Sequence, residues 1–298
     1  MNPYDESAYL SCRLCPRACG ADRLHGESGV CGMGAEATLA HTMLHMWEEP
    51  FLSGTRGSGA VFFSGCSLGC VYCQNRAISR GQMGKTVDEK ALAEVFLSLQ
   101  EQGAHNLNLV TASHFLPSVR EALLLAREKG LRLPVVYNTS GYETVEALRA
   151  LEGLVDIYLT DLRYARAETA ARYSNAPDYP RIAREAICEM VAQTGEPLLS
   201  EDGLLLRGTV VRLLLLPTHL IEAKMSLKHL CDTYGDRIYV SLMRQYTPME
   251  GVPSPLDRPV SNAEYLSLLR YAVSLGITRA FTQEKESIGA SFIPAFEK

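Results

Sequence analysis

Three cysteines lie within eight residues of the stretch SGCSLGCVYCQN. Cys66, Cys70 and Cys73 have the spacing C-x3-C-x2-C, and no fourth thiol or histidine follows nearby. A structural zinc site normally needs four protein ligands, whereas three thiolates can hold three irons of a 4Fe–4S cluster and leave the fourth iron open. The spacing therefore favours an open-iron cluster over a three-cysteine zinc knuckle or core cysteines.

A second group of cysteines lies near the N-terminus. Cys12, Cys15, Cys19 and Cys31 have the spacing C-x2-C-x3-C-x11-C in a glycine-rich segment. Four thiolates can close a zinc site or hold a second Fe–S cluster, and the sequence leaves both alternatives open. The zinc-ribbon character of the spacing favours zinc or a structural cluster. Disulfides are the least expected outcome because clustered cysteines in a reducing compartment indicate metal ligation.

The composition places the chain among ordinary globular proteins. Of its 298 residues, 47% are hydrophobic and 21% are charged, and the net charge is −5. This balance gives no basic surplus for nucleic acid or an anionic membrane surface. The apolar runs are too short to span a bilayer, and the start of the chain lacks a signal-peptide pattern. We expect a cytoplasmic protein with neither a membrane nor a nucleic-acid partner.

The elements that must position these cysteines alternate between strand and helix about six times. Strands are predicted at 60–65, 106–112, 133–141, 155–163, 206–217 and 238–246, with a possible short strand at 279–282, and helices at 87–103, 116–130, 144–153, 179–195, 223–235 and 261–276. This alternation predicts parallel strands joined by right-handed helical crossovers. Six units are too few for a closed eight-fold barrel, and periodicity does not separate an open partial barrel from a doubly wound sheet.

The stretch GCSLGCVYCQN resembles the cluster loop of the radical S-adenosylmethionine (SAM) superfamily, in which an aromatic residue, here Tyr72, commonly precedes the third cysteine. The resemblance implies an α/β fold with a partial (β/α)6 TIM-type barrel at 51–298, preceded by a Cys-rich metal-binding extension at 1–50. It also implies a 4Fe–4S cluster that cleaves SAM reductively. The resulting 5′-deoxyadenosyl radical would abstract hydrogen from a substrate.

A narrower resemblance covers nearly the whole chain. The stretches CRLCPRACG, HMWEEPFLSGTRGSG, PVVYNTSGY, VDIYLTDLRY and MRQYTP resemble homologues of pyruvate formate-lyase activating enzyme, a glycyl-radical-enzyme activase. This likeness implies an oxidoreductase whose substrate is a glycine of a partner glycyl radical enzyme. It further implies an electron donor such as flavodoxin or ferredoxin. A small molecule or a peptide is the alternative substrate.

Polar residues at successive strand ends are the candidates for binding SAM. The family often carries a Gly-Gly-Glu-like turn after the second strand, where this chain has VTASHF. The candidates are Tyr72, Thr111, Ser113, His114, Asn138, Ser140, Asp161, Arg163 and Arg212. For the residues that follow the third strand, a structural role in a capped turn is as well supported as contact with SAM.

Charge and spacing refine three of these candidates. Asp161 and Arg163 alternate with Leu162, so both are expected on one side of the strand, as SAM contacts or as an ion pair with each other. Arg212 interrupts the apolar run VVRLLLLP and needs the barrel interior or a carboxylate as its partner. The segment HMWEEP has two possible interpretations: a solvated edge with one buried Trp, or a wall that faces the substrate. Gln245 and Tyr246 are expected at the substrate mouth.

A protein of another class would explain the cysteines without SAM. An electron-transfer or interaction module would close every iron position and would need no nucleotide pocket. Cys188 and Cys231 lie alone on helix-like stretches, and we expect them to be small buried side chains.

Overall fold

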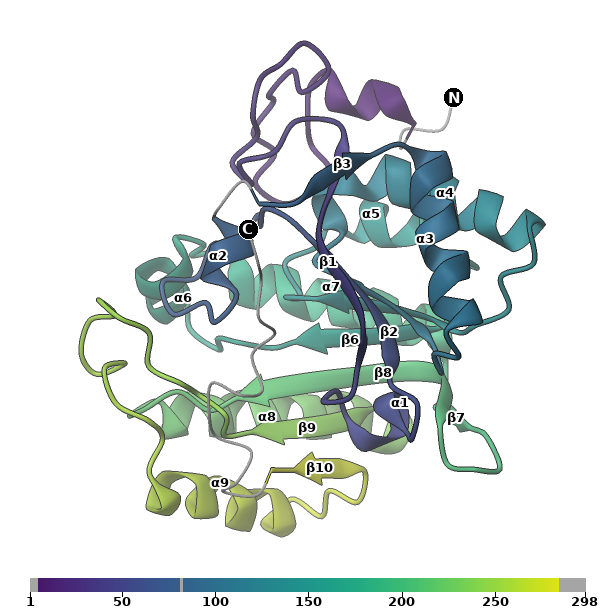
Figure 1. Ribbon diagram of the computed structural model, residues 1–298. Helices are drawn as coiled ribbons and strands as arrows, with labels where there is room; N and C mark the ends of the chain where they lie inside the picture. Colours follow the sequence, from purple (N-terminus) through teal and green to yellow (C-terminus); the bar gives the residue numbers. More distant parts are fainter. Residues whose placement is uncertain (1–4, 81–82, 284–298) are drawn as a thin grey trace.

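The computed structural model describes residues 5–80 and 83–283 and is built around a ten-stranded sheet (Figure 1). The strands are β1 (Ala37–His45), β2 (Ser58–Phe63), β3 (Lys85–Val87), β4 (Leu107–Val110), β5 (Val135–Thr139), β6 (Ile157–Asp161), β7 (Leu198–Leu199), β8 (Leu205–Leu214), β9 (Tyr239–Met243) and β10 (Ala280–Thr282). Their order is β10-β9-β8-β6-β5-β4-β2-β1-β3, and β7 pairs with β8.

The seven strands from β2 to β10 in this order are mutually parallel, whereas β1 and β3 extend the sheet in antiparallel fashion. Among the described residues, the order ends at β10 and β3 without closing on itself. The predicted partial TIM-type barrel is therefore confirmed, and the possible strand at 279–282 is present as β10.

Helices connect the parallel strands and cover the outer face of the sheet (Figure 1). They are α1 (Pro50–Ser53), α2 (Arg76–Ser79), α3 (Glu89–Glu101), α4 (Leu116–Glu128), α5 (Val145–Arg149), α6 (Ala167–Ser174), α7 (Tyr179–Thr194), α8 (Leu220–Tyr234) and α9 (Asn262–Ser274), with 3-10 turns η1 (Glu6–Tyr9), η2 (Ser113–Phe115) and η3 (Gly235–Arg237). All six predicted helices are found. The side chain of Asp88 caps α3, and a Ser261–Glu264 capping box begins α9, which explains why these starts are readable from the sequence.

Side chains alternate between the two faces of the sheet, and each face has its own core. Outward-facing residues of β2, β4, β5 and β6 pack beneath α3, α4, α5 and α7. Inside the barrel, Phe51 and Leu52 of α1 pack against Val136, Ile157 and Leu159. Helix α1 therefore plugs one end of the barrel interior, and polar residues of the same strands face the other end.

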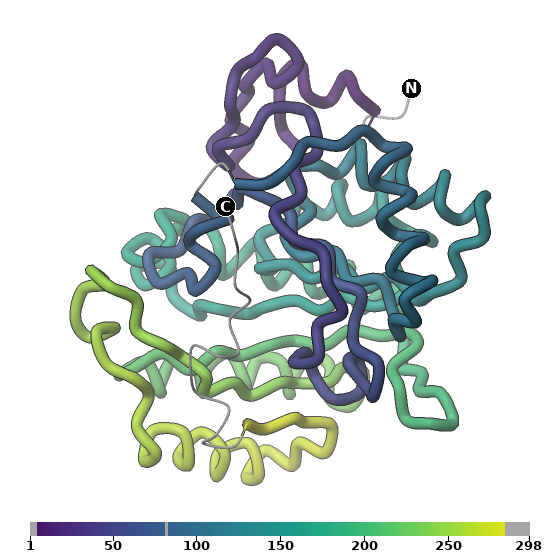
Figure 2. Tube along the Cα trace, viewed as in Figure 1, coloured from purple at the N-terminus to yellow at the C-terminus, as the bar shows by residue number. Residues whose placement is uncertain are grey.

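The N-terminal part of the chain has two structural parts. Residues 5–36 form loops at one end of the molecule, outside the sheet, and the chain then continues into β1 beside β2 (Figure 2). Strand β1 is absent from the strands predicted from the sequence, and it pairs with β2 from Leu39 to His45. Among the described residues, no helix combines the length and apolar character needed to cross a bilayer.

Candidate active site

A cavity of about 770 Å³ opens at the carboxyl ends of the parallel strands, the end where barrels of this type carry their sites. The three cysteines of the loop after β2 all line it. Of the nine residues expected to contact SAM, seven line it as well: Tyr72, Thr111, Asn138, Ser140, Asp161, Arg163 and Arg212. Gln245 and Tyr246 also lie in its wall. The fold thus brings thiols and polar strand ends, separated by long stretches of sequence, around one space.

The sulfur atoms of the cysteine loop accept hydrogen bonds from neighbouring side chains and from the loop backbone. Ser174 Oγ donates to Cys70 Sγ at 3.0 Å, and Ser79 Oγ donates to Cys73 Sγ at 3.4 Å. Backbone N–H groups of Leu68 and Gly69 point to the Cys66 sulfur. Burial raises the pKa of Cys66 to about 11, so an isolated thiol here would stay protonated. Donors aimed at buried sulfurs fit thiolates that a cationic iron cluster holds deprotonated.

The spacing of the three thiols suits a 4Fe–4S cluster, because each thiolate of such a cluster binds its own iron and three thiolates leave the fourth iron open. Cys66, Cys70 and Cys73 all line the cavity. Among the described residues, no group of three or more His, Cys, Asp or Glu side chains is positioned around one metal position.

Asp161 and Arg163 lie on the same side of the strand end and pair with each other. Arg163 Nη2 contacts Asp161 Oδ2 at 2.5 Å, and Arg163 Nη1 donates to Cys70 Sγ at 3.4 Å. Although burial opposes its charge, Asp161 and Cys70 raise the pKa of Arg163, so the guanidinium stays charged. This pair places a cation against a cluster ligand and a carboxylate in the cavity wall.

Thr111, after β4, has a backbone conformation that is unusual for its side chain. Its φ of 63° lies in the left-handed region, which a β-branched residue occupies only at a cost of about 1–3 kcal/mol. Its N–H donates to the carbonyl of Asn138 at 2.9 Å, which fixes the turn against β5. Backbone strain held beside a cavity by neighbouring structure is typical of functional sites.

The N-terminal loops pack directly on the cysteine loop. Arg17 Nε donates to the Ser67 carbonyl at 2.8 Å, and Arg17 Nη2 donates to the Ser174 carbonyl at 2.8 Å. The Cys66 N–H donates to the Cys31 carbonyl at 3.3 Å. At Gly65, with φ 81°, a Cβ would lie 2.3 Å from Met33, so this glycine allows close approach to the N-terminal loops. The cluster loop is therefore held from the Cys-rich side.

The four N-terminal thiols share one compact segment. Cys12, Cys15 and Cys31 are buried and Cys19 is exposed. A Cβ at Gly29 would lie 3.2 Å from Cys31 Sγ and 3.5 Å from Cys19 Sγ. Backbone N–H groups point to the sulfurs of Cys15, Cys19 and Cys31, which suits thiolate ligands of a metal or a cluster.

Two residues expected to contact SAM lie away from the cavity. Ser113 Oγ donates to Glu143 Oε1 at 2.6 Å, and His114 Nε2 bonds the Ser64 carbonyl at 2.6 Å. Both side chains are buried, and neither lines the cavity. The turn after β4 becomes the 3-10 turn η2, which directs these side chains into the core, so the SAM-contact interpretation of Ser113 and His114 is not supported by their positions.

His114 should make stability depend on pH. Burial lowers its pKa to about 4, and Nδ1 has no partner among the described residues. Since the folded-state pKa lies below the unfolded value of about 6.5, the unfolded state binds the proton first, and stability falls as pH drops below 6.5. Between pH 7.5 and pH 5, His114→Gln should lose about 2 kcal/mol less stability than wild type, as measured by urea unfolding.

The control for this prediction is His25→Gln. The side chain of His25 is 74% exposed beside Asp22, so its loss should leave the pH dependence as in wild type. Equal pH dependence in wild type and His114→Gln would contradict the assignment of a neutral buried imidazole.

Arg212 has carboxylate partners that the sequence did not name. Its Nε and Nη2 donate to the two oxygens of Glu49, each at 2.9 Å, and Nη2 also contacts Glu48. Glu48 Oε1 in turn accepts from Asn108 Nδ2 at 2.9 Å and Asn138 Nδ2 at 3.2 Å. Most of the guanidinium is engaged by protein carboxylates, so Arg212 organises the cavity floor.

The burial of the side chains in the HMWEEP segment differs from the expected one. Trp47 is 63% exposed at the cavity rim, whereas the side chains of Glu48 and Glu49 are 8% and 5% exposed. The solvated-edge interpretation with a buried Trp is therefore wrong, and the segment contributes to the cavity wall. The signal was present in the sequence, since Glu-Glu beside an apolar stretch and a lone Arg in an apolar strand need each other as partners.

The comparisons with known proteins agree with this geometry. Residues 60–189 match the sequence pattern of the Radical SAM superfamily. The chain is 28% identical over 253 residues to the uncharacterized protein MJ0674 of Methanocaldococcus jannaschii, covering 82% of this chain and 68% of that protein.

Solved structures show the same fold at low identity. Streptococcus suis SuiB bound to S-adenosylmethionine superposes with a TM-score of 0.51 at 9% identity, and SuiB bound to its precursor peptide SuiA with 0.50 at 10%. Each match covers 74% of this chain, which spans only 49% and 47% of the respective SuiB chains. The likeness shows a shared fold, and the activase branch stays a prediction.

Proposed function

From the premise that this chain contains a radical SAM superfamily domain, we propose that it is an enzyme that abstracts a hydrogen atom from its substrate by radical SAM chemistry. The single observation that carries the proposal is the shared cavity. Cys66, Cys70 and Cys73 border the same space as the polar ends of β5, β6 and β8. A cluster on the thiols and SAM at the strand ends would meet there.

The bound cofactors would supply the radical step. A 4Fe–4S cluster would supply one electron for the reductive cleavage of SAM, and thereby the radical chemistry that removes a hydrogen atom from the substrate. The electron would come from a donor such as flavodoxin or ferredoxin.

The residues of this chain would bind and orient these groups. Cys66, Cys70 and Cys73 would hold the cluster as thiolates. Asp161 offers carboxylate oxygens to the SAM ammonium or ribose hydroxyls, and Arg163 offers charged donors to its carboxylate.

Two substrate classes fit within this proposal. The sequence resemblance to glycyl-radical-enzyme activases supports a glycine of a partner enzyme, which would enter as an extended loop. SuiB has been solved with a precursor peptide, which supports a peptide substrate on a related fold. A small molecule held wholly within the cavity is the alternative.

The proposal is tested by anaerobic reconstitution with iron and sulfide, followed by dithionite and SAM. We expect 5′-deoxyadenosine to form, detected by chromatography with mass spectrometry. A fully loaded cluster that never cleaves SAM would instead support an electron-transfer or interaction module.

We also propose that the N-terminal cysteines hold a separate metal centre, zinc or a second cluster. A Cys66→Ala/Cys70→Ala/Cys73→Ala variant should keep bound metal, because Cys12, Cys15, Cys19 and Cys31 lie on their own segment with its own small core. Elemental analysis would show either about one zinc per chain or iron with sulfide, as four-thiolate sites hold. A metal-free triple variant that remains folded would contradict a separable site.

A further inference from the structure

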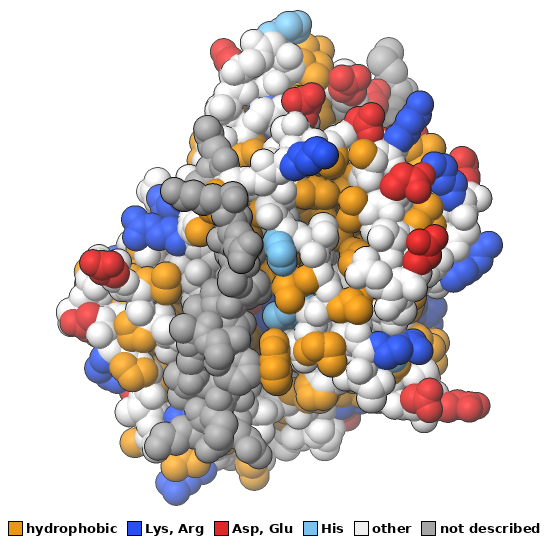
Figure 3. Space-filling model, viewed as in Figure 1, with side chains coloured by type: hydrophobic (Ala, Val, Ile, Leu, Met, Phe, Trp, Pro, Cys, Tyr) orange, Lys and Arg blue, Asp and Glu red, His pale blue; other side chains and the backbone are white. Residues whose placement is uncertain are grey.

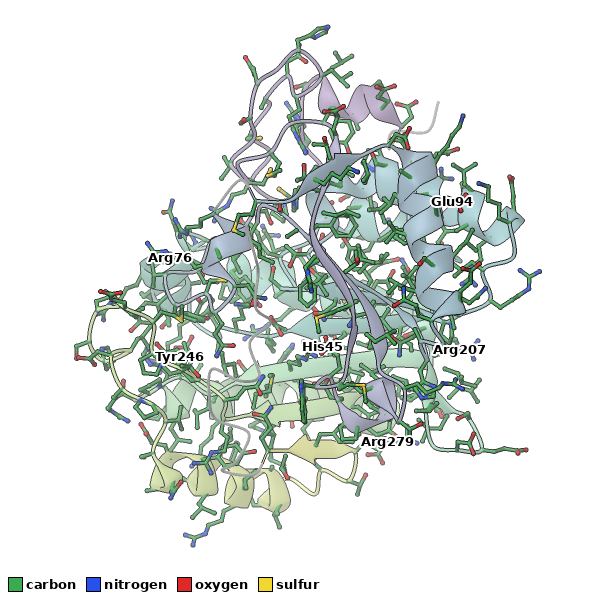
Figure 4. The ribbon with its side chains drawn as sticks, in the orientation of Figure 1. His45, Arg76, Glu94, Arg207, Tyr246 and Arg279 are labelled. Atoms are coloured by element: carbon green, nitrogen blue, oxygen red, sulfur yellow. The ribbon has the colours of Figure 1, made fainter. Side chains whose placement is uncertain are left out.

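The floor of the cavity is a charged chamber, which we define by Glu48, Glu49, Arg212 and His45. Glu48 and Glu49 follow β1, and Arg212 lies near the carboxyl end of β8. All four side chains line the cavity, and Figure 4 shows His45 near the centre of the molecule, in contrast to Glu94 and Arg207 at its periphery. The segment after β1, which lies outside the parallel barrel, thus places two carboxylates in the barrel interior.

The chamber holds more negative than positive charge. Glu48 and Glu49 share the single guanidinium of Arg212. Burial pushes the pKa of Glu49 upward, but the Arg212 charge and hydrogen bonds outweigh it and keep the pKa below its usual range. Burial lowers the pKa of His45, so its imidazole adds no positive charge at neutral pH. Among the described residues that line the cavity, three carboxylates face two guanidinium groups.

The cofactors of the proposed function leave this excess in place. The sulfonium makes SAM a net monocation when its amino and carboxylate groups are ionised. A 4Fe–4S cluster held by three thiolates is a net anion in both redox states, and it would offset the SAM charge. Buried carboxylates without a matching cation are costly, so the chamber needs a further positive charge.

One polar atom of the chamber has unused hydrogen-bonding capacity. His45 is 7% exposed, and its Nδ1 has no partner among the described residues. Asn108 lies behind Glu48, outside the cavity lining, and donates to the Glu48 carboxylate. An unprotonated nitrogen of a neutral imidazole accepts hydrogen bonds, so His45 suits a ligand that carries N–H donors.

We propose that this chamber binds a protonated amine of the substrate, with Glu48 and Glu49 as its counter-charge and His45 as an acceptor. The inference rests on the proposed function and narrows the substrate to cationic molecules or to peptides with a basic side chain. Phe62 and Met243 also line the cavity, which suits the apolar stem of such a group, and Figure 3 shows hydrophobic side chains on the outer surface over β1.

Calorimetry on the anaerobic holoenzyme tests the chamber without turnover. The probes are n-butylammonium, n-butanol and butyrate at equal ionic strength. The variant is Glu48→Gln, which removes the excess charge but leaves Arg212 paired with Glu49. The matched control is Glu94→Gln, an exposed carboxylate on α3 that pairs with Lys129. SAM affinity is measured on the same samples.

We expect wild type and Glu94→Gln to bind n-butylammonium more tightly than either other probe. The Glu48→Gln variant should bind n-butylammonium at least about tenfold more weakly than wild type, which is the scale of one charge-assisted contact. Its affinity for SAM should fall by a smaller factor. No saturable ammonium binding, equal binding of butanol, or unchanged binding in Glu48→Gln would overturn the proposal. An equal loss of SAM affinity would also overturn it, because the chamber would then serve SAM. Failure of SAM cleavage would count against the proposed function alone.

Discussion

Replacing Cys70 with alanine should reduce 5′-deoxyadenosine formation by at least about a thousandfold, a loss typical of removing an essential reactive group. Two thiolates would remain to hold the cluster, and Arg163 and Ser174 would lose the sulfur that they contact. The sheet should persist, because the loop lies beyond the strand ends, although Cys70 itself is buried among core residues such as Tyr72. Iron and sulfide content, product formation and the circular dichroism spectrum should be measured on the same anaerobic preparation.

Cys188→Ala is the matched control for this prediction. Cys188 is exposed on α7, contrary to the expectation of a buried side chain, and Cys231 on α8 is partly buried. Loss of a surface thiol should leave both the iron content and the reaction unchanged. Wild-type rates in Cys70→Ala would show that Cys70 is not a required cluster ligand. Global unfolding of that variant would show that the Cys70 side chain is required for the fold.

The architecture was largely predictable because local and global signals agree. Each predicted helix has an apolar stripe with a cap or stop, such as Asp88 at α3, and central parallel strands such as β2 are apolar runs buried on both faces. Strand β1 was missed because residues 37–45 lie between glycine-rich loops and a charged segment. Its place is set by pairing with β2, a long-range contact that periodicity does not report.

Residue spacing allowed part of the candidate site to be predicted. The C-x3-C-x2-C spacing places three thiols on one loop, and the alternation of Asp161 and Arg163 along the strand places both side chains on the same side. The prediction that Ser113 and His114 contact SAM is not supported, because the chain turns at Thr111 after β4. Thr111 has a left-handed backbone conformation, and the sequence has no glycine at this position that would indicate such a turn. The Glu49–Arg212 pair spans 163 positions, so only the fold could show which carboxylate meets the guanidinium.

Arg212→Gln should destabilise the protein by about 3–5 kcal/mol at pH 7.5, the usual cost of removing one partner from a buried ion pair. Glu48 and Glu49 would then be buried together without a cation. Asn108 and Asn138 can satisfy Glu48 in part, but Glu49 would lose its guanidinium partner and keep neutral donors such as Ser241. Urea unfolding of the anaerobic protein measures the change, and Arg207→Gln, an exposed arginine on the same strand, is the control.

The pH dependence of this loss separates charge from packing. Without Arg212, desolvation and mutual repulsion should raise the pKa values of the two carboxyls above the unfolded value of about 4.3. The folded state would then bind protons that the unfolded state has released, so stability of the variant falls as pH rises. The deficit relative to wild type should therefore shrink between pH 7.5 and pH 5, and adding Glu49→Gln should restore part of it. A deficit that is equal at both pH values, and unchanged by Glu49→Gln, would mean that Arg212 stabilises the barrel through the volume of its side chain and not through its charge.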